Sequence, residues 1–312
     1  MKRVLIVGST KLTQDLVETL LVSQSLEIAG ILTGQEEFQI SYSVDKVHNF
    51  NYANLVPLTD SRGIPSYRML EGMRESALNS WILSLEFDFI LVVGWYHIIP
   101  RSWTEKFICL GIHASLLPKY RGGAPLVWAL LNGESESGVT LFRLDEGVDT
   151  GLVLAQEKFS INDEDTVADL LIKTTEATLK VCDKILPGLD LQDELTYRSQ
   201  VGTVSSYPQR SPLDGKISNV KKSKELRNFI RAQTRPYPGA YLEKNSLKLY
   251  IWSCKPDATK FLEVIPGEIR FDGNSFSIQC EDGLLGLNEC TLIEDGYSIS
   301  DNHQIWKRWI ED

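Results

Sequence analysis

The sequence predicts an α/β fold in which a doubly wound, Rossmann-like domain with a mostly parallel sheet precedes a smaller β-rich domain of barrel (OB) type. In the first half of the 312-residue chain, short apolar runs typical of buried parallel strands alternate with segments of helical periodicity. From residue 241 onward, short strand-like pieces alternate with Gly and Asp turns. The segment 199–216 between them is rich in Ser, Gly and Pro. We therefore expect domains at 1–198 and 217–312, joined by a linker at 199–216.

Five apolar runs predict the first strands of the first domain. They lie at 3–8, 26–34, 62–69, 87–95 and 107–114. Between the first two, residues 12–24 repeat leucine at helical spacing. Strands that alternate with helices imply parallel strands with right-handed crossovers, and such sheets bind ligands beyond the carboxyl ends of their strands. The loop that follows the first run, GSTKLT from Gly8, lacks the GxGxxG spacing, so we reject a nicotinamide cofactor.

Two further strands and a long helix complete the first domain. The strands are predicted at 139–144 and 152–161, and the loop DEGVDTG joins them. The segment 163–186 carries one apolar face, which predicts a helix. Its acidic start at 163–165 suits the positive end of the helix dipole.

The second domain is predicted to open with a short helix at 223–234. Four strand-like pieces then follow at 247–254, 267–271, 275–280 and 284–293. Many short strands separated by turns are typical of a small barrel.

Composition excludes several classes of protein. The formal net charge is −10, and phosphate backbones require clustered Lys and Arg, so a nucleic-acid partner is not expected. The densest basic cluster, at 221–227, is interpreted as the solvated start of a helix. No apolar run reaches the length that spans a bilayer, so no membrane partner is expected. The five cysteines are odd in number and have no CxxC spacing, which indicates reduced thiols in the cytoplasm and no metal site.

One histidine stands out among the four in the chain. In GIHASLLPKYRGGAP, His113 closes a predicted strand immediately before a turn-rich loop. A histidine there either fills space or presents a catalytic group to a cleft. Its place at the carboxyl end of a parallel strand favours the catalytic interpretation.

The segment 112–151 resembles the catalytic segment of the folate-dependent formyltransferases, most closely those that act on nucleotide-linked amino sugars. The family pattern is Asn-x-His, a Ser-Leu-Leu-Pro loop, and an Asp about 36 residues after the histidine. Here Asp149 follows His113 by 36 residues (149 − 113), and residues 115–118 read SLLP. The resemblance extends to 207–241, which is similar to the linker and first C-terminal elements of the members with a barrel-like second domain.

The resemblance implies a reaction and a set of site residues. The family transfers the formyl group of N10-formyltetrahydrofolate, its cosubstrate, to an amine. His113 would donate to the developing oxyanion or move a proton, and Asp149 would orient and charge-stabilise the imidazole. The loop that holds Asp149 would also meet the pterin. Its contacts are expected from Asp145, Gly147 and Val148, with Leu116 packed alongside.

Four more residues are candidates for binding the amine substrate. Ser115 either contacts substrate or caps its own loop. Arg121 either binds substrate phosphates through its bidentate guanidinium or forms a surface ion pair. Gln209 and Arg210 lie where the second domain of this subgroup meets the cleft, and the resemblance suggests contact with a nucleotide.

Gly111 departs from the family, which carries an asparagine there that donates to the formyl oxygen. Loss of one such donor typically costs about 10²–10³ in rate. Tyr96 or His97 would replace the donor, or a water held by the Gly111 backbone would. Alternatively, Tyr96 and its neighbours form a wall against the folate ring.

The amine is predicted to belong to a nucleotide-linked 4-amino or 3-amino deoxysugar. Members that formylate methionyl-tRNA generally carry a basic insertion after the second strand, whereas residues 33–55 here are acidic to neutral. A tRNA substrate remains an alternative. A formyltetrahydrofolate hydrolase and a degenerate folate-binding protein are further alternatives, the second because of Gly111, and a homodimer is left open.

Overall fold

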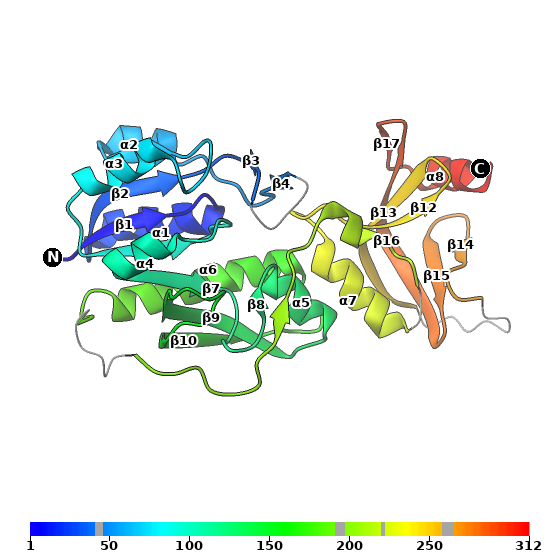
Figure 1. The fold of residues 1–312 in the computed structure, drawn as a ribbon. Coiled ribbons are helices and arrows are strands. Elements are labelled where there is room, and N and C mark those ends of the chain that lie inside the picture. The colour runs from blue at the N-terminus through cyan, green and yellow to red at the C-terminus, as the bar shows by residue number, and fades with distance from the viewer. Residues whose placement is uncertain (41–45, 191–196, 220–221, 258–264, 312) are drawn as a thin grey trace. The chain divides into compact units, whose positions relative to one another are not determined.

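The computed structural model describes residues 1–40, 46–190, 197–219, 222–257 and 265–311 of the chain (Figure 1). It divides into two compact units. The first comprises Met1–Pro125, Glu136–Ser160 and Ile172–Pro208, and the second comprises Leu126–Ser135, Ile161–Leu171 and Gln209–Asp312.

The first unit is built on a seven-stranded sheet of order β10-β9-β7-β6-β1-β2-β5. Its strands are β1 (Arg3–Val7), β2 (Glu27–Thr33), β5 (Ser66–Arg68), β6 (Phe89–Val93), β7 (Cys109–His113), β9 (Glu136–Arg143) and β10 (Val153–Ser160). The first five pair in parallel, whereas β9 is antiparallel to both β7 and β10. The predicted doubly wound, mostly parallel sheet is confirmed.

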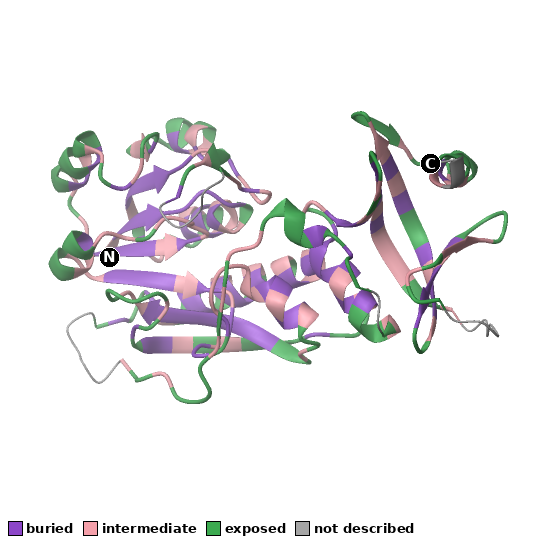
Figure 2. Cartoon of the chain, turned by 45° about the vertical axis from the view of Figure 1, so that its right-hand side comes forward, coloured by how far each residue is buried: buried purple, intermediate pink, exposed green. Residues whose placement is uncertain are grey.

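Successive side chains of the inner strands point to opposite faces of the sheet and pack into two hydrophobic cores. Val4 and Ile6 of β1 join one core with leucines of α1 (Lys11–Ser23) and residues of α6 (Val167–Ile185). Leu5 and Val7 join the other core. There they meet α3 (Ser76–Ser84) and α4 (Arg101–Lys106). Because both faces are covered, the inner strands are almost wholly buried, as Figure 2 shows in purple.

Local signals explain where the helices begin and end. Thr10 Oγ1 accepts a hydrogen bond from Thr13 N, and Thr13 Oγ1 accepts one from Thr10 N. This capping box starts α1. The long helix α6 starts four residues later than the predicted 163, because Asp165 accepts from Asn162 N and closes a turn there. Thr166 and Asp169 then bond reciprocally across the first turn of α6. The acidic residues 163–165 therefore precede the helix rather than begin it.

Shorter elements complete the first half of the chain. They are β3 (Glu37–Phe38) paired with β4 (Val47–His48), α2 (Val56–Arg62), β8 (Arg121–Gly122) and α5 (Pro125–Leu131). β8 pairs in parallel with β11 (Ser206–Tyr207), so the segment predicted as a linker returns to the loop that follows His113 (Figure 1).

The second unit contains an antiparallel six-stranded sheet. Five strands follow the order β12-β13-β16-β15-β14, and β17 (Tyr297–Ile299) pairs with β16. The five are β12 (Ala240–Lys244), β13 (Leu247–Asp257), β14 (Ile269–Phe271), β15 (Phe276–Cys280) and β16 (Gly283–Glu294). A short 3-10 helix (Pro212–Gly215) and α7 (Ser223–Gln233) precede the sheet, and α8 (Asn302–Glu311) follows it. The predicted β-rich second domain is confirmed, whereas its predicted boundaries stay a prediction.

Hydrogen bonds from a largely buried arginine of α7 hold this helix in place within the second unit. The guanidinium of Arg231 donates to the carbonyls of Asn162 and Asp165 and to Asn228 Oδ1. Burial lowers the pKa of Arg231 from its ordinary value, because removal from water penalises the charged form. No helix among the described residues combines the length and apolar character needed to cross a membrane.

Candidate active site

His113 and Asp149, 36 positions apart in the sequence, lie side by side in the first unit. His113 is the last residue of β7, and Asp149 comes from the loop between β9 and β10. Nδ1 of His113 lies 3.5 Å from Oδ2 of Asp149, and the two side chains are 10% and 19% exposed. A mostly buried imidazole and carboxylate at a strand end can exchange a proton with a bound substrate.

The second ring nitrogen of His113 is already engaged. Nε2 lies 2.7 Å from the carbonyl oxygen of Tyr120. Because a carbonyl only accepts, Nε2 donates this bond and carries a hydrogen. Nδ1 is therefore the nitrogen available for proton transfer, and Asp149 faces it.

Hydrogen bonds and a ring stack hold the loop after His113 in place. The hydroxyl of Ser115 donates to the Lys119 carbonyl at 2.6 Å, and Thr140 Oγ1 donates to the Ser115 carbonyl at 2.6 Å. Tyr120 adopts a left-handed φ of 61°, and its ring stacks on Tyr207 with centroids 5.2 Å apart. Of the two roles proposed for Ser115, loop capping is the one seen; contact with substrate stays a prediction.

The conformation of Asp149 is strained and pinned in place. Its φ is 54°, a left-handed value that costs a non-glycine residue about 1–2 kcal/mol. Its Oδ2 accepts from Gly122 N at 2.8 Å, and its carbonyl accepts from Gln200 Nε2 at 2.8 Å. A Cβ on Gly122 would lie 2.3 Å from the Tyr207 carbonyl, so only glycine fits. These contacts hold the carboxylate toward His113.

Three predicted folate-contacting residues shape the Asp149 loop or project from it. Asp145 Oδ1 accepts from Gly147 N at 3.1 Å and from Thr150 Oγ1 at 2.6 Å, so its carboxylate closes the loop. A Cβ on Gly147 would lie 2.0 Å from Thr150 Oγ1. Val148, by contrast, is 58% exposed. Leu116, a fourth candidate, is partly buried. Their contacts with a pterin stay a prediction.

Gly111 lies on β7 two residues before His113, and the space beside it is filled. A Cβ there would lie 2.8 Å from Leu144 Cδ2 and 3.0 Å from Cε1 of Phe142. Phe142 is fully buried on β9 directly across from Gly111. The volume in which a side chain at position 111 would begin is thus already occupied by two apolar side chains.

Tyr96 and His97 follow β6 and pack with other aromatic rings. The Phe38 ring centroid lies 5.4 Å from that of Tyr96 and 4.9 Å from that of His97. Trp95 also contacts the His97 ring, at 5.2 Å. Burial lowers the pKa of His97 from its ordinary value. The folate contact predicted for Tyr96, and the replacement of the missing donor by Tyr96, His97 or a water, stay predictions.

Two of the remaining predicted residues, Arg121 and Arg210, have partners within the protein. Arg121 donates through Nε and a terminal nitrogen to Gln200 Oε1, at 3.2 and 2.7 Å. Arg210, in the second unit, lies 4.9 Å from the Trp128 ring centroid and donates to the Asp214 carbonyl and to Gln233 Oε1. Gln209, also in the second unit, is partly buried. The expected nucleotide contacts of Gln209 and Arg210 stay predictions.

Sequence reasoning missed Gln200 and Ser205. Both lie in the segment interpreted as a linker from its Ser, Gly and Pro content. Ser205 Oγ accepts from Tyr120 N at 2.9 Å, and its carbonyl accepts from Arg121 N at 2.9 Å. Composition carries no signal for such contacts, because they depend on where the segment returns.

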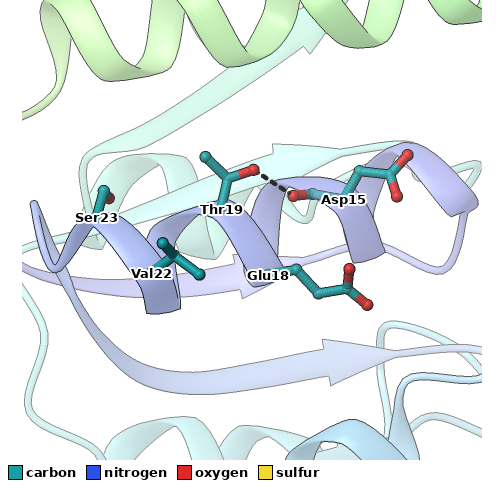
Figure 3. Close-up of a pocket in the computed structure, with 5 residues that line it drawn as sticks. All are labelled: Asp15, Glu18, Thr19, Val22 and Ser23. Atoms are coloured by element: carbon teal, nitrogen blue, oxygen red, sulfur yellow. Dashed lines mark hydrogen bonds between the residues drawn. The ribbon is translucent and has the colours of Figure 1, made fainter.

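A surface hollow on α1 contains none of the predicted site residues. It is lined by Asp15, Glu18, Thr19, Val22 and Ser23 of α1, where the Thr19 hydroxyl donates to the Asp15 carbonyl (Figure 3). None of these side chains belongs to the His113 or Asp149 loops. We therefore place the candidate active site at the strand ends.

A histidine–carboxylate pair at the end of an inner strand of a doubly wound sheet lies where such sheets bind ligands, and it can move a proton during catalysis. The chain belongs to the formyl transferase family: residues 3–185 match the formyl transferase family, and residues 210–300 match its C-terminal domain. It is thus an enzyme of formyl transfer. N10-formyltetrahydrofolate is the donor of this family, and the predicted cosubstrate is confirmed at that level.

Individual relatives agree with this assignment. The methionyl-tRNA formyltransferase of Thermodesulfovibrio yellowstonii is 36% identical over 227 residues, covering 70% of each chain. That of Geobacter metallireducens is 33% identical over 250 residues, covering 75% of each. The N-formyltransferase from Helicobacter canadensis, solved with folinic acid and dTDP-3-aminofucose, superposes with a TM-score of 0.63 at 21% identity, covering 92% of this chain and 99% of that one. At that identity the likeness establishes the fold.

Proposed function

We propose that this enzyme transfers the formyl group of N10-formyltetrahydrofolate to the amine of a nucleotide-linked amino deoxysugar. The juxtaposition of His113 Nδ1 and Asp149 Oδ2 at 3.5 Å supports the chemistry. The donor supplies an activated formyl carbon. The new bond joins this carbon to the substrate nitrogen, the bond to folate N10 breaks, and one proton passes from the amine to N10.

The residues at the strand end suit that proton movement. Nδ1 of His113 faces Asp149, while Nε2 is held by the Tyr120 carbonyl. Because Nε2 keeps its hydrogen for the Tyr120 carbonyl, the imidazole donates to the oxygen that gains negative charge as the imidazolium, through Nδ1. Asp149 balances the charge of the imidazolium and accepts the amine proton directly or through water.

The loop around Asp149 fits a flat heteroaromatic ring beside this pair. Glycines at 147 and 151 let its backbone approach neighbouring groups closely, since a Cβ at either would lie within 2.0 Å of another atom. Val148 presents an exposed apolar side chain from the same loop. Backbone amides and an apolar contact are the groups that a pterin requires.

Charge supports a small anionic substrate rather than a tRNA. The chain carries a formal net charge of −10. The hairpin after β2 pairs Glu36 and Glu37 with His48 and offers no basic cluster among its described residues; 41–45 lie outside them. A polyanion would be repelled by such a surface. Arg121, close to the site in the loop after His113, suits a diphosphate.

Product analysis tests the proposal. Purified enzyme is incubated with N10-formyltetrahydrofolate and thymidine- or uridine-linked 3-amino and 4-amino deoxysugars, and formylated products are measured by mass spectrometry. Formylation of one of these sugars, with kcat/KM at least tenfold above that for initiator methionyl-tRNA, is expected. Efficient formylation of the tRNA alone contradicts the sugar assignment.

Methionyl-tRNA is the second candidate substrate. Its support is that relatives bearing that name share 36% and 33% of aligned residues with this chain. A third outcome, formate release without any amine, would indicate a hydrolase. Folate binding without turnover would indicate a degenerate protein.

A further inference from the structure

The segment from 198 to 207, here called the strap, runs across the loops that carry the catalytic pair. At one end, the backbone of Arg198 exchanges two hydrogen bonds with Val153 of β10, at 2.7 and 2.8 Å. At the other end, Ser206 and Tyr207 form β11 and pair with β8. Both ends of the strap are thus fixed to the first unit.

Gln200 lies within the strap and uses both ends of its carboxamide. Nε2 donates to the carbonyls of Asp149 and Gly151, at 2.8 and 2.9 Å. Oε1 accepts from the Arg121 guanidinium at 3.2 and 2.7 Å. The reverse orientation would set oxygen against two carbonyls and NH₂ against a cation, so the partners dictate how the amide lies.

The two groups that Gln200 joins have different proposed tasks. Asp149 is held in a left-handed conformation with its carboxylate toward His113. Arg121 is the cation that would face the anionic part of the amine substrate. A single side chain therefore sets a proton-handling group and a substrate-binding group relative to each other.

We propose that Gln200 is a positioning residue for formyl transfer, which holds the Asp149 loop and the Arg121 guanidinium in register. This rests on the proposed function. It acts through Asp149 and Arg121, and does not itself touch the reacting atoms.

Two substitutions separate its two contacts. Gln200→Leu removes both contacts. We expect kcat to fall roughly tenfold, because the free energy of about one hydrogen bond corresponds to about a tenfold change in rate. Gln200→Glu retains the acceptor for Arg121 but draws that cation into an ion pair and loses both bonds to the carbonyls. It should raise the KM of the amine substrate severalfold as well as lowering kcat, with the KM of the folate within about twofold of wild type. Ser199→Ala, an exposed change in the same strap, is the matched control and should match wild type.

A readout independent of turnover keeps the proposal separate from the proposed function. The ring resonances of His113, assigned by NMR with His113→Ala, should move in Gln200→Leu in the same direction as in Asp149→Asn, and stay in place in Ser199→Ala. Wild-type kinetics in both Gln200 variants, or unmoved His113 resonances in them, would overturn the positioning role. If wild type formylates no amine, the proposed function fails and the resonances alone decide; Gln200→Glu serves if Gln200→Leu does not fold.

Discussion

Replacing Gly111 by the asparagine of the family pattern should damage this enzyme rather than improve it. A Cβ at position 111 would lie 2.8 Å from Leu144 Cδ2 and 3.0 Å from the ring of Phe142. Leu144 is partly buried and can yield, but Phe142 is locked in the core. Overpacking of this kind costs about 1–3 kcal/mol. An asparagine adds an amide that must find partners in apolar surroundings, about 1–3 kcal/mol more.

The assay combines urea unfolding with formyl-transfer kinetics. Gly111→Ala should lower the free energy of unfolding by about 1–2 kcal/mol, and Gly111→Asn by more. Gly188→Asn is the matched control, because a Cβ at that exposed position meets open space; it should stay within about 0.5 kcal/mol of wild type. The enzyme kcat should fall in Gly111→Asn, since β7 also carries His113.

A double mutant tests the cause. In a Phe142→Leu background, where the ring is gone, Gly111→Asn should cost at least about 0.5–1 kcal/mol less than it does alone. Strict additivity would show that the ring is not the obstacle. Wild-type stability with a raised kcat in the single Gly111→Asn variant would refute the whole line of reasoning, because it would mean that the position is vacant.

Three other predictions follow from the structure. His113→Ala and Asp149→Asn should each lower the formyl-transfer kcat by roughly 10²–10⁴-fold without loss of far-ultraviolet circular dichroism; near-normal rates in both would remove the catalytic pair. Burial lowers the pKa of His97, so the unfolded chain binds a proton that the folded chain resists, and the free energy of unfolding should fall as pH drops below the ordinary value of 6.5. Urea unfolding at pH 7 and pH 5 should therefore show a smaller acid loss in His97→Gln than in wild type, and equal losses would contradict the burial. Burial also raises the pKa of Cys109 to about 12, so iodoacetamide at pH 8.5 should leave it unmodified in the folded protein and label it after unfolding; mass spectrometry detects the difference, and rapid labelling of the folded protein would argue against it.

The sheet was predictable from the sequence because burial on both faces forces continuous apolar runs such as 3–8 and 87–95. The proximity of His113 and Asp149 was predictable because both residues lie in one continuous stretch that matches a family pattern, and their catalytic role stays a prediction. The late start of α6 was not predictable, because Asp165 bonds to the Asn162 backbone and forms a turn where dipole arguments favour helix.

Tertiary contacts carry the rest of the site. Nothing near Gly111 in the sequence indicates that Phe142 and Leu144 occupy the space beside it, since β8 and α5 lie between β7 and β9 in the sequence. Gln200 and Ser205 could not be predicted either, because their contacts are also made to segments distant in the sequence. Their segment has the composition of a connector, and its role comes from pairing with β8.

The strap sets a lower limit on how far this enzyme can be shortened. A chain cut after α6 would keep all seven strands of the large sheet, together with His113 and Asp149. It would lose the amide that binds the Asp149 carbonyl, the hydroxyl that receives Tyr120 N, and the ring that stacks on Tyr120. The smallest fragment with an intact site therefore extends at least to Tyr207, well beyond the point where the last helix of the sheet ends.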